Sequence, residues 1–348
     1  MKRVGIVGCG SIAAVHAAAL FALEGVKLCA FSDMEKSRAE GFAEKYGHGY
    51  ANSYDSLEAM LEEEKLDAVH VCTPHYLHVP MAEMILQKGI SAFVEKPTAV
   101  SPEEFEKLER TAACSAGRLG FCFQNRYNGT TCKIDELLQE GTLGEVKSMR
   151  AFVTWNRPKE YYQESNWRGT WAAEGGGALI NQSVHTLDLL LRWMGEPEYI
   201  DASMRNHHLK GIIEVEDTVE AFLAFPGGKR ACFYATTAYG EDAPVMIELA
   251  CEKGRIFTEG NLVTVTERSG ETKIYDCSSG RTFGKSYWGA GHETCIADFY
   301  RCMESGGAFQ NDIASVRNVT RTMFEIYRQG KGCLEREPFV GKQPQSIE

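Results

Sequence analysis

Short apolar runs and longer amphipathic segments alternate through the first part of the chain, up to residue 123. The apolar runs predict strands, and the segments between them predict helices. The predicted strands are Val4–Val7, Val26–Phe31, Ala68–Cys72, Ser91–Val94 and Leu119–Phe123. The predicted helices are Ile12–Leu23, Glu35–Tyr46, Ser56–Glu64, Val79–Gln87 and Ser101–Ser115. This alternation is typical of an α/β domain with a doubly wound parallel sheet that helices cover on both faces.

The pattern changes after Gln124. The predicted helices are Cys132–Glu140, Leu179–Met194, Glu293–Met303 and Ile313–Arg328. The predicted strands are Val146–Trp155, Asp217–Phe225, Arg230–Thr237, Val245–Ala250 and Leu262–Thr266, and residues 219–225 alternate as in a strand with one better-buried face. We therefore predict two domains, residues 1–123 and 124–348. The second is α+β around a mainly antiparallel sheet, and its last helix can pack back on the first domain.

Composition excludes several classes of protein. The chain has 348 residues, 44% of them hydrophobic and 24% charged, which is enough apolar material for folded domains. Its formal net charge of −11 argues against nucleic acid or anionic lipid as the main partner. No apolar run reaches the roughly 18 residues of a membrane span, and the first residues lack the apolar core of a signal peptide. We therefore expect neither nucleic acid nor membrane among the partners.

The 12 cysteines form no CxxC pair and no regularly spaced framework. Several of them lie inside apolar runs, namely Cys29, Cys72, Cys122 and Cys232. This placement is typical of reduced core residues, so we expect a cytoplasmic protein.

One group has spacing that is similar to that of metal ligands: Cys72, His75 and His78. The alternative is that Cys72 ends a buried strand and the histidines open the next helix. A zinc site needs a complete ligand set, which this group lacks, so we expect no metal.

A GxGxxA motif at residues 8–13 follows the first predicted strand and opens the first helix. In this context the first glycine makes the tight turn, the second admits a pyrophosphate, and Ala13 lets helix and strand pack closely. Asp33 ends the second strand, where a carboxylate accepts from ribose hydroxyls and repels a 2′-phosphate. We therefore expect NAD rather than NADP, a preference that the nearby Arg38 weakens. The expected contacts in this turn are Gly8, Gly10, Ser11 and Ile12.

Two further motifs follow strands of the same sheet. Thr73-Pro74-His75 comes after the strand that ends at Cys72, and Glu95-Lys96-Pro97 comes after the strand that ends at Val94. Ligands bind at the carboxyl ends of such strands. Lys96 could relay a proton from a substrate hydroxyl there, because apolar surroundings lower the pKa of an amine. The alternative is a surface lysine paired with Glu95.

A glycine-rich segment, Glu174–Asp188, holds a third cluster. Its three glycines let the backbone approach something flat or bulky. If the following residues form one helix, Asn181 and His185 lie one turn apart and Asp188 lies on the same side. A polar stripe on an otherwise apolar helix is costly to bury without partners, which favours a site over core packing.

Together these motifs resemble the Gfo/Idh/MocA family of NAD(P)-dependent oxidoreductases. The resemblance runs along nearly the whole chain through GCGSIA, CTPHYLH, VEKP, FQNRY, NWRGTW, EGGGALINQSVHTLDLL and YWGAGH. It implies a Rossmann domain followed by an α+β domain with a large open sheet, whose face covers the substrate cleft or builds dimers and tetramers. It also implies that Lys96 and His185 are catalytic, and that the bond before Pro97 is often cis.

The chain departs from the family pattern at Asn181, where many dehydrogenases of the family carry Asp. An amide cannot take a proton, so Asn181 can only orient a hydroxyl or Lys96, and the general base must be Lys96 or His185. Members that act at sugar 3-positions also carry Asn here, which disfavours a plain inositol dehydrogenase.

Other residues are expected to line the site. Aromatic candidates for stacking on a sugar are Trp155, Trp167, Trp171, Trp288, Tyr161 and Tyr162. The expected substrate-binding residues are Asn181, Arg168, Trp167, Tyr127, Arg157 and His292. The expected cofactor-binding residues beyond the first turn are Asp33, Arg38, Thr73, Pro74, His75, His78, Glu95, Lys96 and Gln124.

We therefore expect an NAD-dependent oxidoreductase that acts on a secondary alcohol of a sugar, glycoside, sugar derivative or cyclitol, with the 3-position as one candidate. One alternative is a redox-neutral NAD-dependent glycosidase of the same family, and a weaker one is a non-catalytic sugar or NAD sensor. We expect a homodimer or homotetramer.

Overall fold

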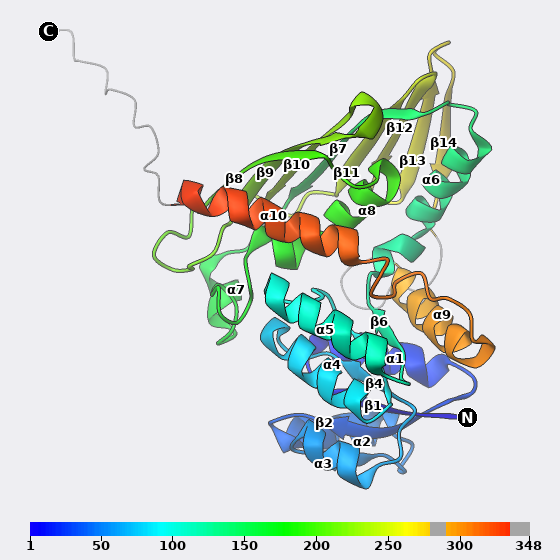
Figure 1. Ribbon diagram of the computed structural model, residues 1–348, viewed down its shortest axis with the longest axis vertical. Helices are drawn as coiled ribbons and strands as arrows, with labels where there is room; N and C mark the ends of the chain where they lie inside the picture. The colour runs from blue at the N-terminus through cyan, green and yellow to red at the C-terminus, as the bar shows by residue number, and fades with distance from the viewer. Residues whose placement is uncertain (279–289, 335–348) are drawn as a thin grey trace, which may run out of the picture.

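The computed structural model describes residues 1–278 and 290–334. Two sheets form its framework, a smaller parallel sheet near the N-terminus and a larger curved sheet at the opposite end of the molecule (Figure 1). The α/β architecture predicted from the sequence is confirmed, with a Rossmann-type sheet followed by a large, mainly antiparallel one. None of the helices in this described part has the length and apolar character that crossing a membrane requires.

The first sheet has six parallel strands in the order β3-β2-β1-β4-β5-β6. Its strands are β1 (Lys2–Val7), β2 (Val26–Ser32), β3 (Asn52–Tyr54), β4 (Ala68–Val71), β5 (Ser91–Val94) and β6 (Leu119–Phe121). The chain reverses direction across the sheet between β1 and β4, and ligands of doubly wound sheets bind at this switch point. The central strands β4 and β5 are buried along their whole length, as their continuous apolar sequence predicts.

Helices cover both faces of this sheet. Their bounds are α1 (Ser11–Ala22), α2 (Lys36–Tyr46), α3 (Leu57–Glu63), α4 (His78–Gln87) and α5 (Pro102–Cys114), with a short 3₁₀ turn η1 (His75–Leu77) before α4. Helix α5 begins after an N-cap serine, because the Ser101 hydroxyl accepts from the amide of Glu104. The same face as α1 also receives a helix from the far end of the chain, α9 (Gly291–Ser305), whose Phe299 packs on Phe93 of β5.

The second sheet has eight strands in the order β14-β13-β12-β11-β7-β10-β9-β8. Its strands are β7 (Val146–Thr154), β8 (Tyr199–Arg205), β9 (Thr218–Phe225), β10 (Lys229–Thr236), β11 (Met246–Cys251), β12 (Gly254–Glu259), β13 (Leu262–Glu267) and β14 (Thr272–Asp276). All neighbouring pairs are antiparallel except β7 and β10. The residue-by-residue alternation predicted for residues 219–225 is confirmed, with Val219, Ala221 and Leu223 buried and Glu220 and Phe222 exposed.

The remaining helical segments lie around and beneath this sheet. Their bounds are η2 (Gln124–Tyr127), α6 (Gly129–Glu140), α7 (Lys159–Gln163), a π-helical turn η3 (Ala178–Ser183), α8 (Val184–Met194), η4 (Pro226–Gly228) and α10 (Arg317–Leu334). Helices α8 and α10 lie on the side of the sheet that faces the first domain (Figure 1). Helix α10 contacts both parts of the molecule, because it packs on β8 while its Thr320 hydroxyl lies 2.8 Å from that of Thr98.

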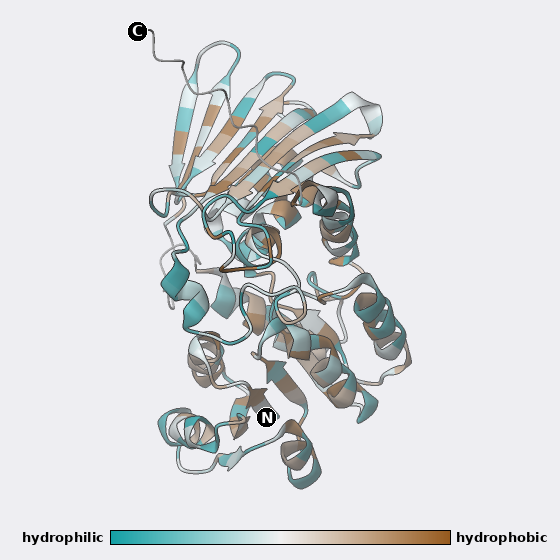
Figure 2. Ribbon diagram, turned by 90° about the vertical axis from the view of Figure 1, so that its left-hand side faces the viewer, coloured by the Kyte–Doolittle hydropathy of each residue, from teal (hydrophilic) through white to brown (hydrophobic). Residues whose placement is uncertain are grey.

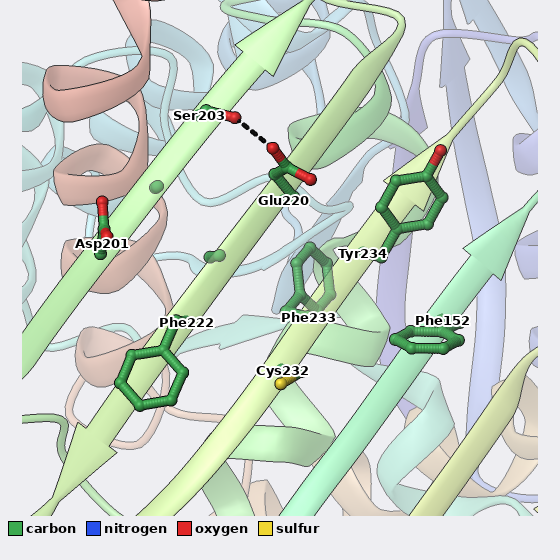
Figure 3. Close-up of a pocket in the computed structure, with 10 residues that line it drawn as sticks. Phe152, Asp201, Ser203, Glu220, Phe222, Cys232, Phe233 and Tyr234 are labelled. Carbon is green, nitrogen blue, oxygen red and sulfur yellow. Dashed lines mark hydrogen bonds between the residues drawn. The ribbon is translucent and has the colours of Figure 1, made fainter.

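The opposite, outer face of the large sheet carries no helix in the described part of the chain (Figure 2). A shallow hollow on this face has Phe152, Phe222, Tyr234 and Cys232 along three adjacent strands (Figure 3). Cys232 is therefore exposed, and the prediction that it lies in the core is wrong, because alternate residues of β10 point to opposite faces. Cys29, Cys72 and Cys122 are buried and all 12 cysteines are free thiols, as the sequence predicts.

Candidate active site

The turn after β1 has the backbone geometry of a dinucleotide-binding loop. Gly8 has φ +85°, and a Cβ atom there would lie 2.7 Å from the carbonyl oxygen of Cys72. A Cβ on Gly10 would instead meet nothing within 4 Å, so the loop is open on the side where a pyrophosphate would approach the start of α1. Asp33 steadies the loop, since its carboxylate accepts from the amides of Cys9 at 2.8 Å and Glu35 at 2.9 Å.

These residues fit a dinucleotide. The carboxylate of Asp33 keeps acceptor positions for ribose hydroxyls, because each oxygen takes only one backbone amide within the described residues. The buried hydroxyl of Thr73 has no hydrogen-bond partner in the described part of the chain and lies at the end of β4, beside the loop. Arg38 is exposed and pairs with Glu35 at 2.9 Å.

The central feature of the site is the contact between Lys96 and the glycine-rich segment. The Lys96 ammonium donates to the backbone oxygen of Asn181 at 2.8 Å and to its Oδ1 at 3.1 Å. Burial lowers the pKa of Lys96, while the carboxylates of Glu95 and Glu174 raise it in part. The Lys96–Pro97 peptide bond is cis. The structure therefore joins the EKP motif and the Asn181 segment, which are 85 residues apart in sequence.

Two residues complete the surroundings of Asn181. Its Nδ2 donates to a carboxylate oxygen of Glu174 at 2.5 Å. Tyr161 lies on the other side, with its hydroxyl 3.4 Å from Asn181 Nδ2 and 2.9 Å from Gln182 Nε2. Burial raises the pKa of Glu174 to about 7.

His185 stands in the first turn of α8, close enough to Lys96 for the ammonium charge to disfavour a second proton on the ring. Burial and that charge lower the pKa of His185 to about 3, so its imidazole is neutral. Its Nδ1 is buried and has no hydrogen-bond partner among residues 1–278 and 290–334.

The glycine-rich segment is not one regular helix. Residues Ala178–Ser183 form a π-helical turn, and α8 begins at Val184. The predicted single-helix spacing of Asn181 and His185 is therefore wrong, because the turn widens between them. The glycines approach the protein's own chain, and a Cβ on Gly177 would lie 2.0 Å from the carbonyl oxygen of Glu216.

Asp188 does not belong to the site. Its carboxylate pairs with the guanidinium of Arg126 at 2.5 and 2.8 Å, and both side chains are buried. Arg126 also donates to the backbone oxygens of Gln310 and Ser315. The predicted grouping of Asn181, His185 and Asp188 is therefore only partly correct, because Asp188 binds Arg126 and joins α8 to neighbouring segments.

A buried chain of hydrogen bonds lies behind the lysine. The carboxylate of Glu95 is 2.8 Å from Nε2 of His16, whose Nδ1 is 2.8 Å from Nδ1 of His70. Nε2 of His70 is 2.9 Å from the hydroxyl of Tyr300 on α9. Burial lowers the pKa of His16, but hydrogen bonding and charge interactions with Cys122 and Glu95 outweigh this effect and raise the pKa to about 9. Glu95 therefore forms its ion pair with His16, and no ion pair joins its carboxylate to the Lys96 ammonium in the described part of the chain.

The aromatic residues and Arg168 meet on one side of Lys96. The Trp167 and His75 rings are 4.7 Å apart between centroids, and the Arg168 guanidinium lies 4.3 Å from the centroid of Tyr161. Nδ1 of His75 donates to the carbonyl of Glu174 at 2.8 Å. Aromatic faces and a guanidinium around one amine are suited to the C–H faces and hydroxyls of a carbohydrate.

Other predicted site residues hold neighbouring parts of the protein. Arg157 pairs with Asp242 at 2.8 Å, and the hydroxyl of Tyr127 donates to Asp298 at 2.7 Å. The His78 ring lies between the carbonyls of Pro97 and Thr73. Gln124, His292, Trp155 and Tyr162 are buried, and Trp171 is partly buried against the core. Trp288 lies outside the described residues.

Sequence reasoning missed three residues of this region. Glu174 precedes the three glycines and gave no separate signal, because a carboxylate before a turn is usually solvated. His16 and His70 lie within an alanine-rich helix and a buried strand, where the sequence shows only isolated polar positions. A buried histidine in such a run needs a partner, and this was the available signal.

Comparison with known proteins agrees with this geometry. Residues 2–121 match the oxidoreductase family with an NAD-binding Rossmann fold, and residues 132–257 match the GFO/IDH/MocA C-terminal domain. The chain belongs to the Gfo/Idh/MocA oxidoreductase family. The resemblance of the sequence motifs to this family is confirmed, and the Rossmann domain of this Gfo/Idh/MocA protein is of the NAD-binding kind.

Two curated relatives of this Gfo/Idh/MocA protein act on sugars at position 3 by their names. D-glucoside 3-dehydrogenase of Escherichia coli (strain K12) is 33% identical over 199 residues, which are 56% of this chain and 54% of the relative. Glucose-6-phosphate 3-dehydrogenase of Bacillus subtilis (strain 168) is 26% identical over 209 residues, 59% of this chain and 57% of the relative. The chain thus aligns with little more than half the length of each.

Solved structures match the Gfo/Idh/MocA fold over a greater length. The WlbA dehydrogenase from Bordetella pertussis, in complex with NADH and UDP-GlcNAcA, has a TM-score of 0.81 at 25% identity and covers 97% of this chain and 99% of its own. Levoglucosan dehydrogenase in complex with NADH and L-sorbose has a TM-score of 0.85 at 18% identity, covering 96% of this chain and 97% of its own, and shows the fold alone.

Proposed function

We propose that this protein is an NAD-dependent oxidoreductase that acts on a secondary alcohol of a sugar, glycoside, sugar derivative or cyclitol, with carbon 3 of a hexose ring as the candidate position. The observation that carries the proposal is the contact of partly buried Lys96 with Asn181, beside His185 and the dinucleotide loop. The names of two relatives support position 3.

The side chains divide the proton work between them. A bound nicotinamide would exchange a hydride with the carbon that carries the hydroxyl. Lys96 accepts the hydroxyl proton, because burial lowers its pKa and makes the neutral amine accessible. The imidazole of His185 hydrogen-bonds to the same hydroxyl. Because its pKa is lowered to about 3, the ring is neutral and carries no second proton to give to the substrate. Asn181 exchanges no proton and orients the lysine.

Substrate binding falls to the residues around this amine. We assign Trp167 and Tyr161 to stacking on the ring and Arg168 to hydrogen bonding with its hydroxyls. Arg157 and Tyr127, which are held by Asp242 and Asp298, would act by shaping the pocket wall.

We assign NAD rather than NADP as the cofactor, with Asp33 as the deciding residue. We also place the protein in a reducing compartment, the cytoplasm, which its 12 free cysteines support.

The experiment is a test of turnover with a substrate panel. The purified protein is mixed with NAD⁺ and, separately, glucosides, glucose 6-phosphate, cyclitols and nucleotide-linked sugars, and NADH formation is followed by absorbance. We expect net NADH from at least one sugar of the panel. Hydrolysis of a glycoside without net NADH would contradict the proposal and favour a redox-neutral glycosidase.

We further propose that the protein is a homodimer or homotetramer built through the outer face of the large sheet. Phe222 on this face is 39% exposed, and Phe152 and Tyr234 lie beside each other on paired strands (Figure 3). Exposed aromatic side chains that gather on one face favour an association site.

A further inference from the structure

Glu174 is a buried carboxylate that the mechanism above does not use. It is 1% exposed, and one of its oxygens accepts from the amide of Gly169 at 2.5 Å. Its other oxygen accepts from Nδ2 of Asn181, whose Oδ1 in turn accepts from Lys96. A chain of hydrogen bonds therefore connects the Glu174 carboxylate, the Asn181 amide and the Lys96 amine, with the amide in the middle.

The neighbours of Asn181 determine which way its amide points. An amide donates through nitrogen and accepts through oxygen, and its two ends have almost the same shape. A carboxylate can only accept and an ammonium can only donate. One orientation alone satisfies both neighbours, with Nδ2 toward Glu174 and Oδ1 toward Lys96.

We propose that Glu174 is a positioning residue of the proton-transfer site, which fixes the Asn181 amide and through it holds Lys96 and places a negative charge one side chain away from the lysine nitrogen. This inference rests on the proposed function, in which Lys96 takes the substrate proton. Because Asn181 carries no charge of its own, Glu174 supplies the carboxylate on this side of the lysine.

The charge of Glu174 depends on pH. Burial raises the pKa of Glu174 to about 7, so its negative charge is gained as the pH rises through neutrality. Above that pH the carboxylate accepts from Nδ2 of Asn181 and favours the protonated form of Lys96.

Several other groups face Lys96. They are Glu95, Arg168, Cys122, His75, His185 and His292, which come from the segment after β5, the loop before Gly169, the segment after β6, η1, α8 and α9. Glu95 is already paired with His16 at 2.8 Å. A change of charge at Glu174 therefore changes the net charge around Lys96 and with it the pKa of the lysine.

The test compares Glu174→Gln with a matched control, Glu216→Gln. Glu216 is also fully buried, and its carboxylate accepts from the amides of Gly177 and Leu179 in the same glycine-rich segment. Its side chain makes no hydrogen bond with Lys96 or Asn181 among the described residues. Both variants lose a buried carboxylate, so both report any loss of folding stability.

We expect the two variants to differ in the pH dependence of sugar oxidation. Glu174→Gln removes a charge that favours the protonated lysine, so the pH at which the rate rises with loss of the Lys96 proton falls by about one unit. Glu216→Gln leaves that midpoint in place. The double variant Glu174→Gln/Asn181→Asp returns a carboxylate to the chain and raises the midpoint again.

A second measurement needs neither cofactor nor turnover. The Lys96 side-chain carbon resonances, titrated by NMR in the full-length protein, give the lysine pKa directly, and Glu174→Gln lowers it whereas Glu216→Gln does not. Identical titrations in wild type and Glu174→Gln would overturn the inference. If Lys96→Met kept full activity, the proposed function would fail instead, so the two failures are distinguishable.

Discussion

At the scale of single residues, Lys96 is the side chain on which the proposed chemistry depends most. Its ammonium is held by two oxygens of Asn181, and it has no alternative surface partner in Glu95, which is bound to His16. Lys96→Met keeps most of the apolar stem and removes the amine. We expect NAD⁺ binding by calorimetry to be retained while kcat falls by about 10²–10⁴-fold, the usual contribution of a positioned acid–base group.

His185→Ala is the companion variant. Because the imidazole is already neutral, we expect weaker substrate binding and a lower kcat without a new pH midpoint between pH 5 and 8. A pH–rate profile of wild type that contains a histidine ionisation absent from His185→Ala would contradict this assignment.

Asn181→Asp introduces a charge where the structure has an amide. The new carboxylate would accept directly from Lys96 and would face Glu174 across the present 2.5 Å hydrogen bond. Two carboxylates at that distance share a proton, so the pair has a single negative charge. In the variant this charge is shared by the group that contacts Lys96, whereas in the wild type the Asn181 amide separates it from the lysine. We expect the Lys96 midpoint in sugar oxidation to move to higher pH with NAD⁺ affinity unchanged. Superimposed pH–rate profiles would remove Asn181 from the proton-transfer site.

We expect Asp33 to determine the choice between NAD⁺ and NADP⁺. Its carboxylate would repel a 2′-phosphate, and Arg38 lies near enough to attract one once that charge is gone. We expect wild type to have the higher kcat/KM with NAD⁺ and Asp33→Ala to bring the two cofactors closer together. Arg38→Ala serves as the control and should widen the preference for NAD⁺.

At the scale of elements, helix α8 carries two ion pairs that differ in burial. Asp188 and Arg126 are both buried, whereas Arg192 and Asp135 are about one-third exposed at a distance of 2.8 Å. Removing one member of a buried pair leaves the other charge without compensation, so Asp188→Ala should lower the free energy of unfolding by about 3–5 kcal/mol. Arg192→Ala on the same helix should cost about 1 kcal/mol or less. Denaturant titrations measure both, and equal losses would contradict the distinction.

The alternation of strands and helices was enough to predict most elements of the first domain and the strands β7, β9, β10, β11 and β13 of the second. Four strands were missed, namely β3, β8, β12 and β14. Strand β3 has three residues, and β14 is mostly exposed, so neither contains an apolar run. A strand at the end of a sheet buries little, and its pairing depends on the neighbour rather than on its own sequence.

The site was predictable where a motif follows a strand and not where distant segments meet. Lys96 and Asp33 lie at strand ends, so the parallel sheet predicts their place. The contact of Lys96 with Asn181 depends on the π-helical turn at Ala178–Ser183, and local periodicity gives no sign of that turn. The role of Asp188 depends on Arg126, 62 residues away, which no spacing rule connects to it.

At the scale of the whole molecule, the C-terminal segments join the two sheets. Helix α9 packs on α1 of the first domain, and α10 lies between β8 and α5, where Arg317 pairs with Glu109 at 2.6 Å. The buried chain from Glu95 to Tyr300 crosses the same junction. The segment that contains Glu95 and Lys96 is thus connected by hydrogen bonds to helix α9, which comes almost 200 residues later in the chain. The domain boundary at residues 123–124 remains a prediction.

The outer face of the large sheet gives the last prediction. Phe222, Tyr234 and Phe152 place aromatic side chains across β9, β10 and β7, while the inner face is occupied by α8 and α10 (Figures 1 and 3). Phe222→Glu places a charge among these aromatic side chains, at a position already 39% exposed, so folding should be preserved and association weakened. Tyr50→Glu, at a 73% exposed position of the first domain, is the matched control. Light scattering after size exclusion should show an oligomer for wild type and Tyr50→Glu and a smaller species for Phe222→Glu. A monomeric wild type, or an oligomer that Phe222→Glu leaves intact, would show that this face does not build the assembly.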